Sequence, residues 1–293
     1  MNCDRIGIMN GGSNISIRPK PFLKWAGGKS RLASEIASFF PEQYNDYYEP
    51  FLGSGAIYFE IAPQHGILND LNANLINTYE TIKCNPRGLL KELAVIEMEY
   101  NGFNGLDGQS DYYYAVRERY NHKEMSDLEK AALFIFLNKA GWNGMYRENS
   151  VGEFNIPFGK RTRISICDKK NIMSVSKNIQ KMKFTSLDYK EAVCGASEGD
   201  LVYFDPPYFP ISKTASFTDY QKAGFTERDQ MELYDLAVAL ARKGCYVVIS
   251  NSDCEKVEKL YKDFTIKKVK VSRTIGAKVS TRGTIYEIVA LSY

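Results

Sequence analysis

Seven short apolar runs, each bounded by turn-forming residues, recur along the chain and predict the strands of a sheet. Helical periodicity lies between several of them, as in Ser30–Phe40 and Glu227–Lys243. This alternation predicts an α/β fold with a mostly parallel sheet. The last two runs are joined by a glycine-containing segment and predict an antiparallel pair at one edge. The seven runs are Tyr47–Phe51, Gly66–Asn69, Met182–Leu187, Leu201–Phe204, Tyr246–Ser250, Thr265–Val271 and Thr284–Leu291.

The strand pattern stops between residues 78 and 163. That stretch is rich in Tyr, Asn and Gly and holds one strong helical pattern, Asp127–Ala140. It predicts a small, mainly helical domain inserted into an α/β domain made of residues 19–77 and 164–293. Residues 1–18 carry Asp4 and a Gly-Gly-Ser-Asn stretch, and we interpret them as a loose N-terminal tail rather than a signal peptide.

The charge of the chain is almost balanced, but its distribution is uneven. With 293 residues, 44% of them hydrophobic, and a formal net charge of +3, the total charge does not indicate a polyanionic partner. Residues 155–190 nevertheless hold nine Lys and Arg against two Asp, and residues 256–282 hold nine against Glu258 and Asp263. These stretches predict a basic face, with an ordinary solvated surface as the alternative.

Cysteine and histidine usage excludes several kinds of chemistry. The six cysteines contain no Cys-x-x-Cys pair, and His65 and His122 stand outside any metal spacing, so zinc sites, disulfide frameworks and histidine-dependent hydrolysis have no support. Reduced thiols are typical of cytoplasmic proteins, which is the location we expect. The longest apolar run, Ala131–Leu137, is too short to span a bilayer. We therefore expect neither a metal nor a membrane partner.

The run Leu201–Phe204 leads directly into Asp205, Pro206, Pro207 and Tyr208, which suit chemistry on a planar nitrogen. The prolines offer carbonyl acceptors held by a fixed φ and no N–H donors, beside a carboxylate and a ring able to stack on a base. Acceptors for both hydrogens of an exocyclic amine, such as N6 of adenine, would direct its lone pair toward an electrophile. A proline-stiffened loop that closes a strand is the alternative.

A glycine turn, Glu49–Gly55, lies between a predicted strand and a helical pattern, where an open α/β sheet binds nucleotide-like ligands. Asn69-Asp70 ends the next strand, where an acidic side chain accepts hydrogen bonds from ribose hydroxyls. Tyr58 replaces the third glycine of a dinucleotide motif, so a plain tight turn is the alternative. Leu23 stands where a phosphate loop ending in Gly28-Lys29-Ser30 needs glycine, which gives a nucleoside triphosphatase little support.

Five motifs, in this order along residues 21–293, resemble those of the alpha-order DNA adenine-N6 methyltransferases, especially the DNA adenine methylases that act on 5′-GATC-3′. The resemblance implies a Rossmann-like methyltransferase sheet, a target-recognition domain with a β-hairpin, S-adenosylmethionine as cofactor and double-stranded DNA as partner. The motifs are Phe22–Lys29, Glu49–Gly55, Asn69-Asp70, the hairpin segments Asn143–Arg147 and Gly152–Gly159, and Asp205–Tyr208.

The resemblance also gives roles to residues. The catalytic set is Asp205, Pro206, Pro207 and Tyr208, and the adenine would leave the duplex to stack on the tyrosine ring. The implied cofactor-binding set is Trp25, Lys29, Glu49, Phe51, Gly53, Gly55, Asp70, Asp188 and Asp205. The implied DNA-binding set is Trp142, Asn143, Met145, Arg147, Asn149, Pro157, Lys160, Arg161 and Arg163. No metal is implied, because a sulfonium is itself the electrophile.

Several members of the DNA-binding set have more than one reading. Trp142 would stack on or wedge beside the base left unpaired, or it lies buried in a core. Arg147 has the donor geometry to bind O6 and N7 of guanine, or it forms a surface salt bridge with a neighbouring glutamate. Lys160-Arg161 stands where relatives carry a base-reading arginine, which leaves the exact site open. We expect Arg163 to hold phosphate.

The sequence thus predicts transfer of a methyl group from S-adenosylmethionine to N6 of adenine in DNA, within 5′-GATC-3′, with a cognate restriction endonuclease as genetic partner. The first alternative is methylation of cytosine N4 or an RNA adenine, because the catalytic motif does not choose the base. The second is a DNA-binding regulator without catalysis, against which the intact Asp205 and glycine turn argue.

Overall fold

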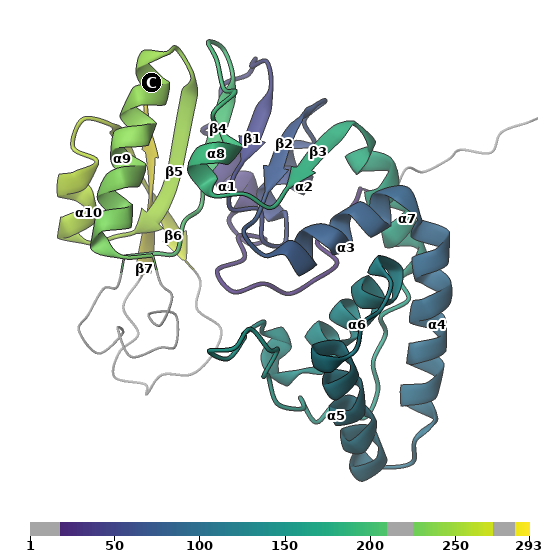
Figure 1. The fold of residues 1–293 in the computed structure, drawn as a ribbon. Coiled ribbons are helices and arrows are strands. Elements are labelled where there is room, and N and C mark those ends of the chain that lie inside the picture. Colours follow the sequence, from purple (N-terminus) through teal and green to yellow (C-terminus); the bar gives the residue numbers. More distant parts are fainter. Residues whose placement is uncertain (1–17, 210–224, 272–284) are drawn as a thin grey trace, which may run out of the picture.

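The computed structural model describes residues 18–209, 225–271 and 285–293, so the predicted tail lies almost wholly outside the described residues. A seven-stranded sheet in the order β3-β2-β1-β4-β5-β7-β6 forms the centre of the α/β part (Figure 1). Strands β1 to β5 run parallel, whereas β7 is antiparallel to both β5 and β6. The strands are β1 (Tyr47–Glu49), β2 (Gly66–Asn69), β3 (Met182–Thr185), β4 (Leu201–Phe204), β5 (Tyr246–Ser252), β6 (Thr265–Val271) and β7 (Ile285–Leu291).

The predicted fold class is confirmed: the protein is α/β, with a mostly parallel sheet and an antiparallel β6–β7 pair at one edge. Strands β1 and β3 each end two residues before the predicted limit. Their last apolar residues belong to loops and have other partners, since Phe51 stacks on Tyr189 at 5.4 Å and the Leu187 N–H donates to Asn69 Oδ1. An apolar pattern alone does not separate the end of a strand from an apolar loop.

Alternation along the strands divides the core into two layers. Tyr47 and Tyr203 pack on one face of the sheet, whereas Tyr48 and Val202 pack on the other. The first face is covered by α1 (Ala33–Ala37), α2 (Ala56–Ile61), α3 (Ala73–Cys84) and α7 (Lys169–Asn178), and the second by α8 (Tyr189–Ala192), α9 (Glu227–Arg242) and α10 (Glu255–Leu260). Strand β4 is fully buried between the layers, which explains its unbroken apolar run.

Helix α1 is shorter than the predicted Ser30–Phe40. The N–H groups of Phe39 and Phe40 donate to Ile36 and Ala37, three residues back, so the helix closes in tighter turns at its end. In the described part of the chain, no helix is long and apolar enough to cross a membrane, and no group of three His, Cys, Asp or Glu side chains is placed to hold a metal ion.

Helices α4 (Pro86–Gly102), α5 (Leu106–His122) and α6 (Asp127–Ala140) lie together below the sheet in Figure 1. Helix α6 has the predicted bounds. Its N-cap hydroxyl, on Ser126, accepts the Glu129 N–H, and its residues 131–137 are each at most 2% exposed, which explains their apolar run. The predicted domain boundary between residues 77 and 78 falls inside α3. The division into a catalytic domain and an inserted domain stays a prediction.

The hairpin predicted from the segments Asn143–Arg147 and Gly152–Gly159 opens with a short 3₁₀ turn, η1 (Trp142–Gly144). Its arms are joined by isolated antiparallel bridges, Gly141 with Phe158 and Glu148 with Phe154, rather than by strands. The hairpin is therefore present as a pair of bridged loop segments.

The buried side chain of Asn69 ties together the segments that follow β1, β2 and β3. Its Nδ2 donates to the carbonyls of Pro50 and Leu187, each at 3.0 Å, and its Oδ1 accepts from Leu187 N at 2.9 Å and Thr185 Oγ1 at 2.8 Å. Since Asn69 is only 1% exposed, these hydrogen bonds are shielded from water. They hold the carboxyl ends of three strands at one level.

Candidate active site

The glycine turn after β1 is held from two sides. The Gly53 N–H donates to Asp70 Oδ2 at 2.9 Å, and the Tyr79 hydroxyl donates to the Gly53 carbonyl at 3.1 Å. Gly53 (φ +50°) and Gly55 (φ +67°) both adopt the left-handed conformation that glycine tolerates best. A Cβ at Gly53 would also lie 2.7 Å from Cδ1 of Trp25. The close approach of the indole explains why this position lacks a side chain.

Trp25 connects this turn to the hairpin. Its ring stacks on Tyr146 with centroids 5.4 Å apart and an interplanar angle of 21°, and it packs on Phe134 of α6 at 6.2 Å. Lys24, next to it, is joined to α6 through Asn138, which accepts its N–H and donates to its carbonyl. The N-terminal motif therefore lies between the glycine turn and the predicted recognition hairpin.

Three of the predicted cofactor residues follow β1, β2 and β3. Asp70 accepts from Gly53 through Oδ2 and from the Asn72 N–H through Oδ1, at 2.9 Å each. Burial raises the pKa of Asp70, and these two backbone hydrogen bonds act against the rise. Asp188 is exposed and caps α8 by accepting the Lys190 N–H at 2.9 Å. Phe51 stacks on Tyr189, the first residue of α8, so Phe51 and Asp188 lie in adjoining loops.

Lys29 and Asp205 bring the first and last motifs into direct contact. Lys29 is 5% exposed, and its Nζ lies 2.9 Å from Asp205 Oδ1 and 2.7 Å from the Gly27 carbonyl. The same ammonium stands 4.5 Å above the ring centroid of Tyr208. Burial raises the pKa of Asp205, the Lys29 charge lowers it, and the Glu287 charge raises it further. The net direction is upward.

Asp205 also presents an acceptor that is not fully used. Although Lys29 lies at ion-pair distance, Oδ1 of this carboxylate has no aligned hydrogen-bond donor among the described residues. Glu49, on β1, is 2% exposed and accepts the Tyr47 hydroxyl at 2.8 Å. Burial raises the pKa of Glu49 well above its ordinary value, the Tyr47 hydrogen bond opposes that rise, and the Asp205 charge adds to it.

A buried polar network fixes the loop that follows β4. Gln230 of α9 donates through Nε2 to the Pro207 carbonyl at 2.9 Å, and its Oε1 accepts from Asn251 Nδ2 at 3.0 Å. Asn251 in turn accepts the Phe209 N–H at 3.1 Å. Of the two proline carbonyls predicted as acceptors, that of Pro207 is therefore already engaged. The Pro206 carbonyl receives no hydrogen bond from any residue that the structure describes.

The hairpin brings most of the predicted DNA-binding residues together. Trp142 is 50% exposed and Met145 is 37% exposed, so the reading of Trp142 as a core residue is wrong. The Trp142 N–H donates across the hairpin to the Pro157 carbonyl at 2.9 Å, and Asn143 adopts a positive φ of 54°. Arg147 donates through Nε to Asn155 Oδ1 at 2.9 Å, which orients its guanidinium.

Asn149 organises the tip of the hairpin. Its Oδ1 accepts the N–H groups of Val151 and Glu153 at 3.0 Å each, and its Nδ2 donates to Glu153 Oε2 at 2.7 Å. These contacts form an Asx-type turn, so the Asn149 side chain stabilises the hairpin itself. If Asn149 also contacts DNA, it must do so in addition to these hydrogen bonds.

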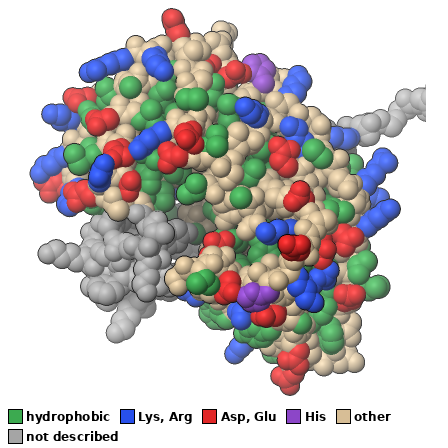
Figure 2. All heavy atoms as spheres, in the orientation of Figure 1, with side chains coloured by type: hydrophobic (Ala, Val, Ile, Leu, Met, Phe, Trp, Pro, Cys, Tyr) green, Lys and Arg blue, Asp and Glu red, His purple; other side chains and the backbone are tan. Residues whose placement is uncertain are grey.

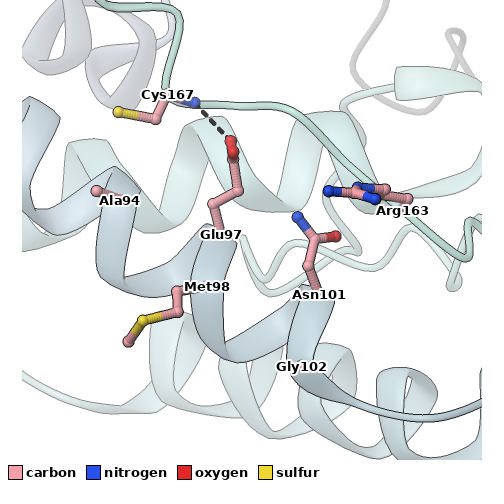
Figure 3. Close-up of a pocket in the computed structure, with 7 residues that line it drawn as sticks. All are labelled: Ala94, Glu97, Met98, Asn101, Gly102, Arg163 and Cys167. Carbon is pink, nitrogen blue, oxygen red and sulfur yellow. Dashed lines mark hydrogen bonds between the residues drawn. The ribbon is translucent and has the colours of Figure 1, made fainter.

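The remaining basic residues of the predicted DNA-binding set follow the hairpin in the sequence. Lys160 and Arg161 are exposed, and the Arg161 carbonyl accepts the Tyr100 hydroxyl. Arg163 lines an open pocket beside α4, where Figure 3 shows its side chain close to Asn101. On the face shown in Figure 2, cationic and anionic side chains are mixed over the described surface, so that face carries no extended region of one sign.

Sequence reasoning missed the residues that act on the site from other elements. Gln230 and Asn251 hold the Pro207–Phe209 backbone, and Glu287 of β7 accepts the Tyr208 hydroxyl at 2.7 Å. Only Glu287 left a signal: it is the single charged residue in the otherwise apolar run Ile285–Leu291. Gln230 and Asn251 could not be identified from the sequence around them, because the residues that they bond are distant in sequence.

The fold and the site define a class of protein. A Rossmann-like sheet with a glycine turn after β1 and an acidic residue after β2 is the arrangement of α/β enzymes that bind nucleotide-like ligands at the carboxyl edge of the sheet. Residues 25–275 match the model of the D12 class N6 adenine-specific DNA methyltransferases. The chain belongs to this family, and the predicted enzyme class, an adenine-specific DNA methyltransferase, is confirmed.

Named relatives agree over nearly the whole chain. The type II methyltransferase M1.LlaDCHI of Lactococcus lactis subsp. cremoris is 42% identical over 282 residues, which cover 94% of this chain and 96% of the relative. The type II methyltransferase M.MjaIII of Methanocaldococcus jannaschii is 36% identical over 287 residues, 94% and 99%. The DNA adenine methylase of Escherichia coli K12 is 33% identical over 275 residues, 93% and 95%.

Gly53→Ala should displace Trp25, because the new Cβ would lie 2.7 Å from the indole at a positive φ. We expect a loss of roughly 2 kcal/mol or more in the free energy of unfolding, about 1–2 from the left-handed backbone and the rest from the clash. Urea unfolding and tryptophan fluorescence measure both effects. Gly152→Ala is the matched control: its φ is +85°, but nothing lies within 4 Å of its Cβ. Equal losses in the two variants would show that Trp25 does not constrain Gly53.

Proposed function

We propose that this chain methylates N6 of an adenine that has flipped out of a DNA duplex, with S-adenosylmethionine as the donor and 5′-GATC-3′ as the site. The observation that carries the proposal is the pair of acceptors beyond β4: the Asp205 carboxylate, whose Oδ1 is in ion-pair contact with Lys29 at 2.9 Å, and the Pro206 carbonyl, which no described residue bonds. An adenine N6 group has two hydrogens to donate, and two acceptors at the end of one strand match that number.

The residues present fit the donor that we propose. When bound, S-adenosylmethionine supplies a methyl group on a positively charged sulfonium. Gly53 keeps the turn free of a side chain, and Asp70 holds that turn while each of its oxygens retains a second lone pair for a ribose hydroxyl. Phe51 and Asp188 border the adjoining loops. The carboxylates of Asp70 and Asp205 favour a cationic ligand.

The chemistry asked of the protein is orientation and electrostatic support. Asp205 and the Pro206 carbonyl would each accept one N6 hydrogen, which turns the nitrogen lone pair out of the ring system and toward the methyl group. Positive charge then develops on N6, and the Asp205 carboxylate stabilises it in a site with little water. Lys29 favours the ionised form of Asp205, as its effect on the pKa shows. Tyr208 offers the ring on which the adenine stacks.

Recognition of the site falls to the hairpin. Trp142 is half exposed beside Pro157 and could fill the space that the flipped base leaves, while the guanidinium of Arg147 is oriented by Asn155. A DNA adenine methylase is among the relatives, which supports adenine as the target base. Two further relatives are type II methyltransferases, so we propose a cognate restriction endonuclease as a genetic partner.

Methylation mapping tests the proposed function directly. Sequencing of modified bases in DNA from cells that express the chain should show N6-methyladenine within 5′-GATC-3′. Asp205→Ala should abolish most of that signal, because loss of such a contact in a dry site costs about 10²–10³ in kcat. Methylated adenines at another sequence would refute the site and leave the chemistry standing. Full methylation by Asp205→Ala would refute the role of the carboxylate.

The pH dependence tests the charge state of Asp205. Transfer needs the carboxylate ionised, so kcat falls as the pH drops through the pKa of Asp205, which burial raises and Lys29 lowers. Lys29→Met removes the lowering influence, so the acid limb of kcat, measured at saturating donor and DNA, should move to higher pH. Lys83→Met is the control, because Lys83 of α3 donates to the Met182 carbonyl of β3 and does not contact Asp205. An unmoved acid limb in Lys29→Met would mean that Asp205 is not the titrating group.

Two arginines should respond differently to DNA sequence. If Arg147 binds guanine O6 and N7, Arg147→Ala should cost roughly 1–3 kcal/mol on the cognate duplex and relax preference at that base. Arg163→Ala, if Arg163 holds phosphate, should weaken binding to every duplex and reduce the salt slope by about one. Binding titrations on cognate and one-base-altered duplexes at two salt concentrations separate the roles. Equal losses on all duplexes for Arg147→Ala would exclude base reading.

A further inference from the structure

Glu287 lies on β7 in a row of side chains that face the core. Val289 and Leu291, two and four residues further along, are 0% and 5% exposed and pack in the same layer as α1 and α2. Glu287 itself is partly buried, so a hydrogen-bond partner lowers the cost of its carboxylate at this place. No Lys or Arg within the described ranges forms an ion pair with Glu287, and the hydroxyl of Tyr208 donates to its Oε2 at 2.7 Å.

The position of Glu287 relative to Tyr208 is fixed by the sheet. Glu287 pairs with Ser252 of β5 and Val269 of β6 in antiparallel register. The hydroxyl of Ser252 donates to the carbonyl of Phe209, the residue after Tyr208, at 2.8 Å. The acceptor carboxylate and the loop that it contacts are therefore bound to the same neighbouring strand.

Tyr208 is held from a second direction by Lys29, whose Nζ stands 4.5 Å above the ring centroid. The ammonium covers one face of the ring, so a stacked base would have to meet the opposite face. Burial, the Asp205 charge and the Glu287 charge raise the pKa of the Tyr208 hydroxyl well above its ordinary value, so it keeps its proton and stays a donor. Together the two contacts restrain both the tilt and the rotation of the ring.

We infer that Glu287 is a positioning residue for the target base: by accepting the Tyr208 hydroxyl it sets the ring plane on which the flipped adenine stacks, and hence the approach of N6 to Asp205. This inference rests on the proposed function, since it takes Tyr208 as the stacking platform. Without the carboxylate, the ring would sample other rotamers and fewer complexes would align N6 for transfer.

Three variants separate the ring contact from the charge. Glu287→Ala removes the acceptor, Tyr208→Phe removes only the donor, and Glu287→Gln keeps an acceptor oxygen without the charge. We expect Glu287→Ala and Tyr208→Phe each to lower kcat about 10- to 100-fold with KM for DNA almost unchanged. The double variant should be no slower than the slower single variant, because both remove one contact. Glu287→Gln should retain most of the activity. Glu258→Ala, which removes an exposed carboxylate paired with Lys268 on another element, should behave as wild type.

Two spectroscopic readouts follow the ring itself. A duplex with 2-aminopurine at the mapped target position reports stacking of the flipped base through its fluorescence. In protein labelled with 3-fluorotyrosine, the ¹⁹F resonance of ring 208 is identified by its loss in Tyr208→Phe. Glu287→Ala should alter both signals, and Glu287→Gln should preserve them.

Several results would overturn the inference. These are wild-type kcat with an unchanged fluorine resonance in Glu287→Ala, losses that multiply in the double variant, or a loss in Glu287→Gln as large as in Glu287→Ala. A wild-type chain that leaves adenine unmethylated would contradict the proposed function instead. The fluorine resonance needs neither DNA nor donor, so it would still decide whether Glu287 fixes the Tyr208 ring.

Discussion

The hydrogen bonds of Asn69 are the constraint on which the rest of the site depends. Parallel strands place their carboxyl ends at one edge of the sheet, but the loops beyond those ends are free to diverge unless something joins them. Asn69, which is only 1% exposed, joins the loop after β1 to the loop after β3 through two carbonyls and an N–H. The glycine turn includes Pro50, and Asp70 follows Asn69, so these hydrogen bonds restrain the position of both.

The site holds more negatively than positively charged side chains. Glu49, Asp70, Asp205 and Glu287 surround a region in which Lys29 is the cation in direct contact with a carboxylate. Burial raises the pKa of Glu49, Asp70 and Asp205, which means that each carboxylate is more costly to ionise in the folded chain than in water. A bound cation would offset part of that cost. This excess of negative charge is consistent with the positively charged donor that we propose.

The sequence predicted the sheet well, because apolar alternation and turn residues are local signals. It predicted β2, β4 and β6 at their observed bounds, and the glycine turn by its composition. It did not predict that Gln230 occupies the Pro207 carbonyl or that Glu287 holds Tyr208. Periodicity shows which face a residue occupies, whereas the partner on that face depends on strand order and helix packing, and β7 reaches Tyr208 only because it lies beside β5.

Trp25 shows how the two ends of the site are linked. Its indole packs against the backbone of Gly53, which has no side chain in the way, and it also stacks on Tyr146 of the hairpin. Contact alone does not establish coupling between sites. Here, however, the indole lies so near Gly53 that even a methyl group would not fit, so the ring has little room to yield toward the turn. A hairpin that moves toward the sheet as it engages DNA must therefore either shift the glycine backbone or tilt the indole, and both of these groups border the proposed cofactor site.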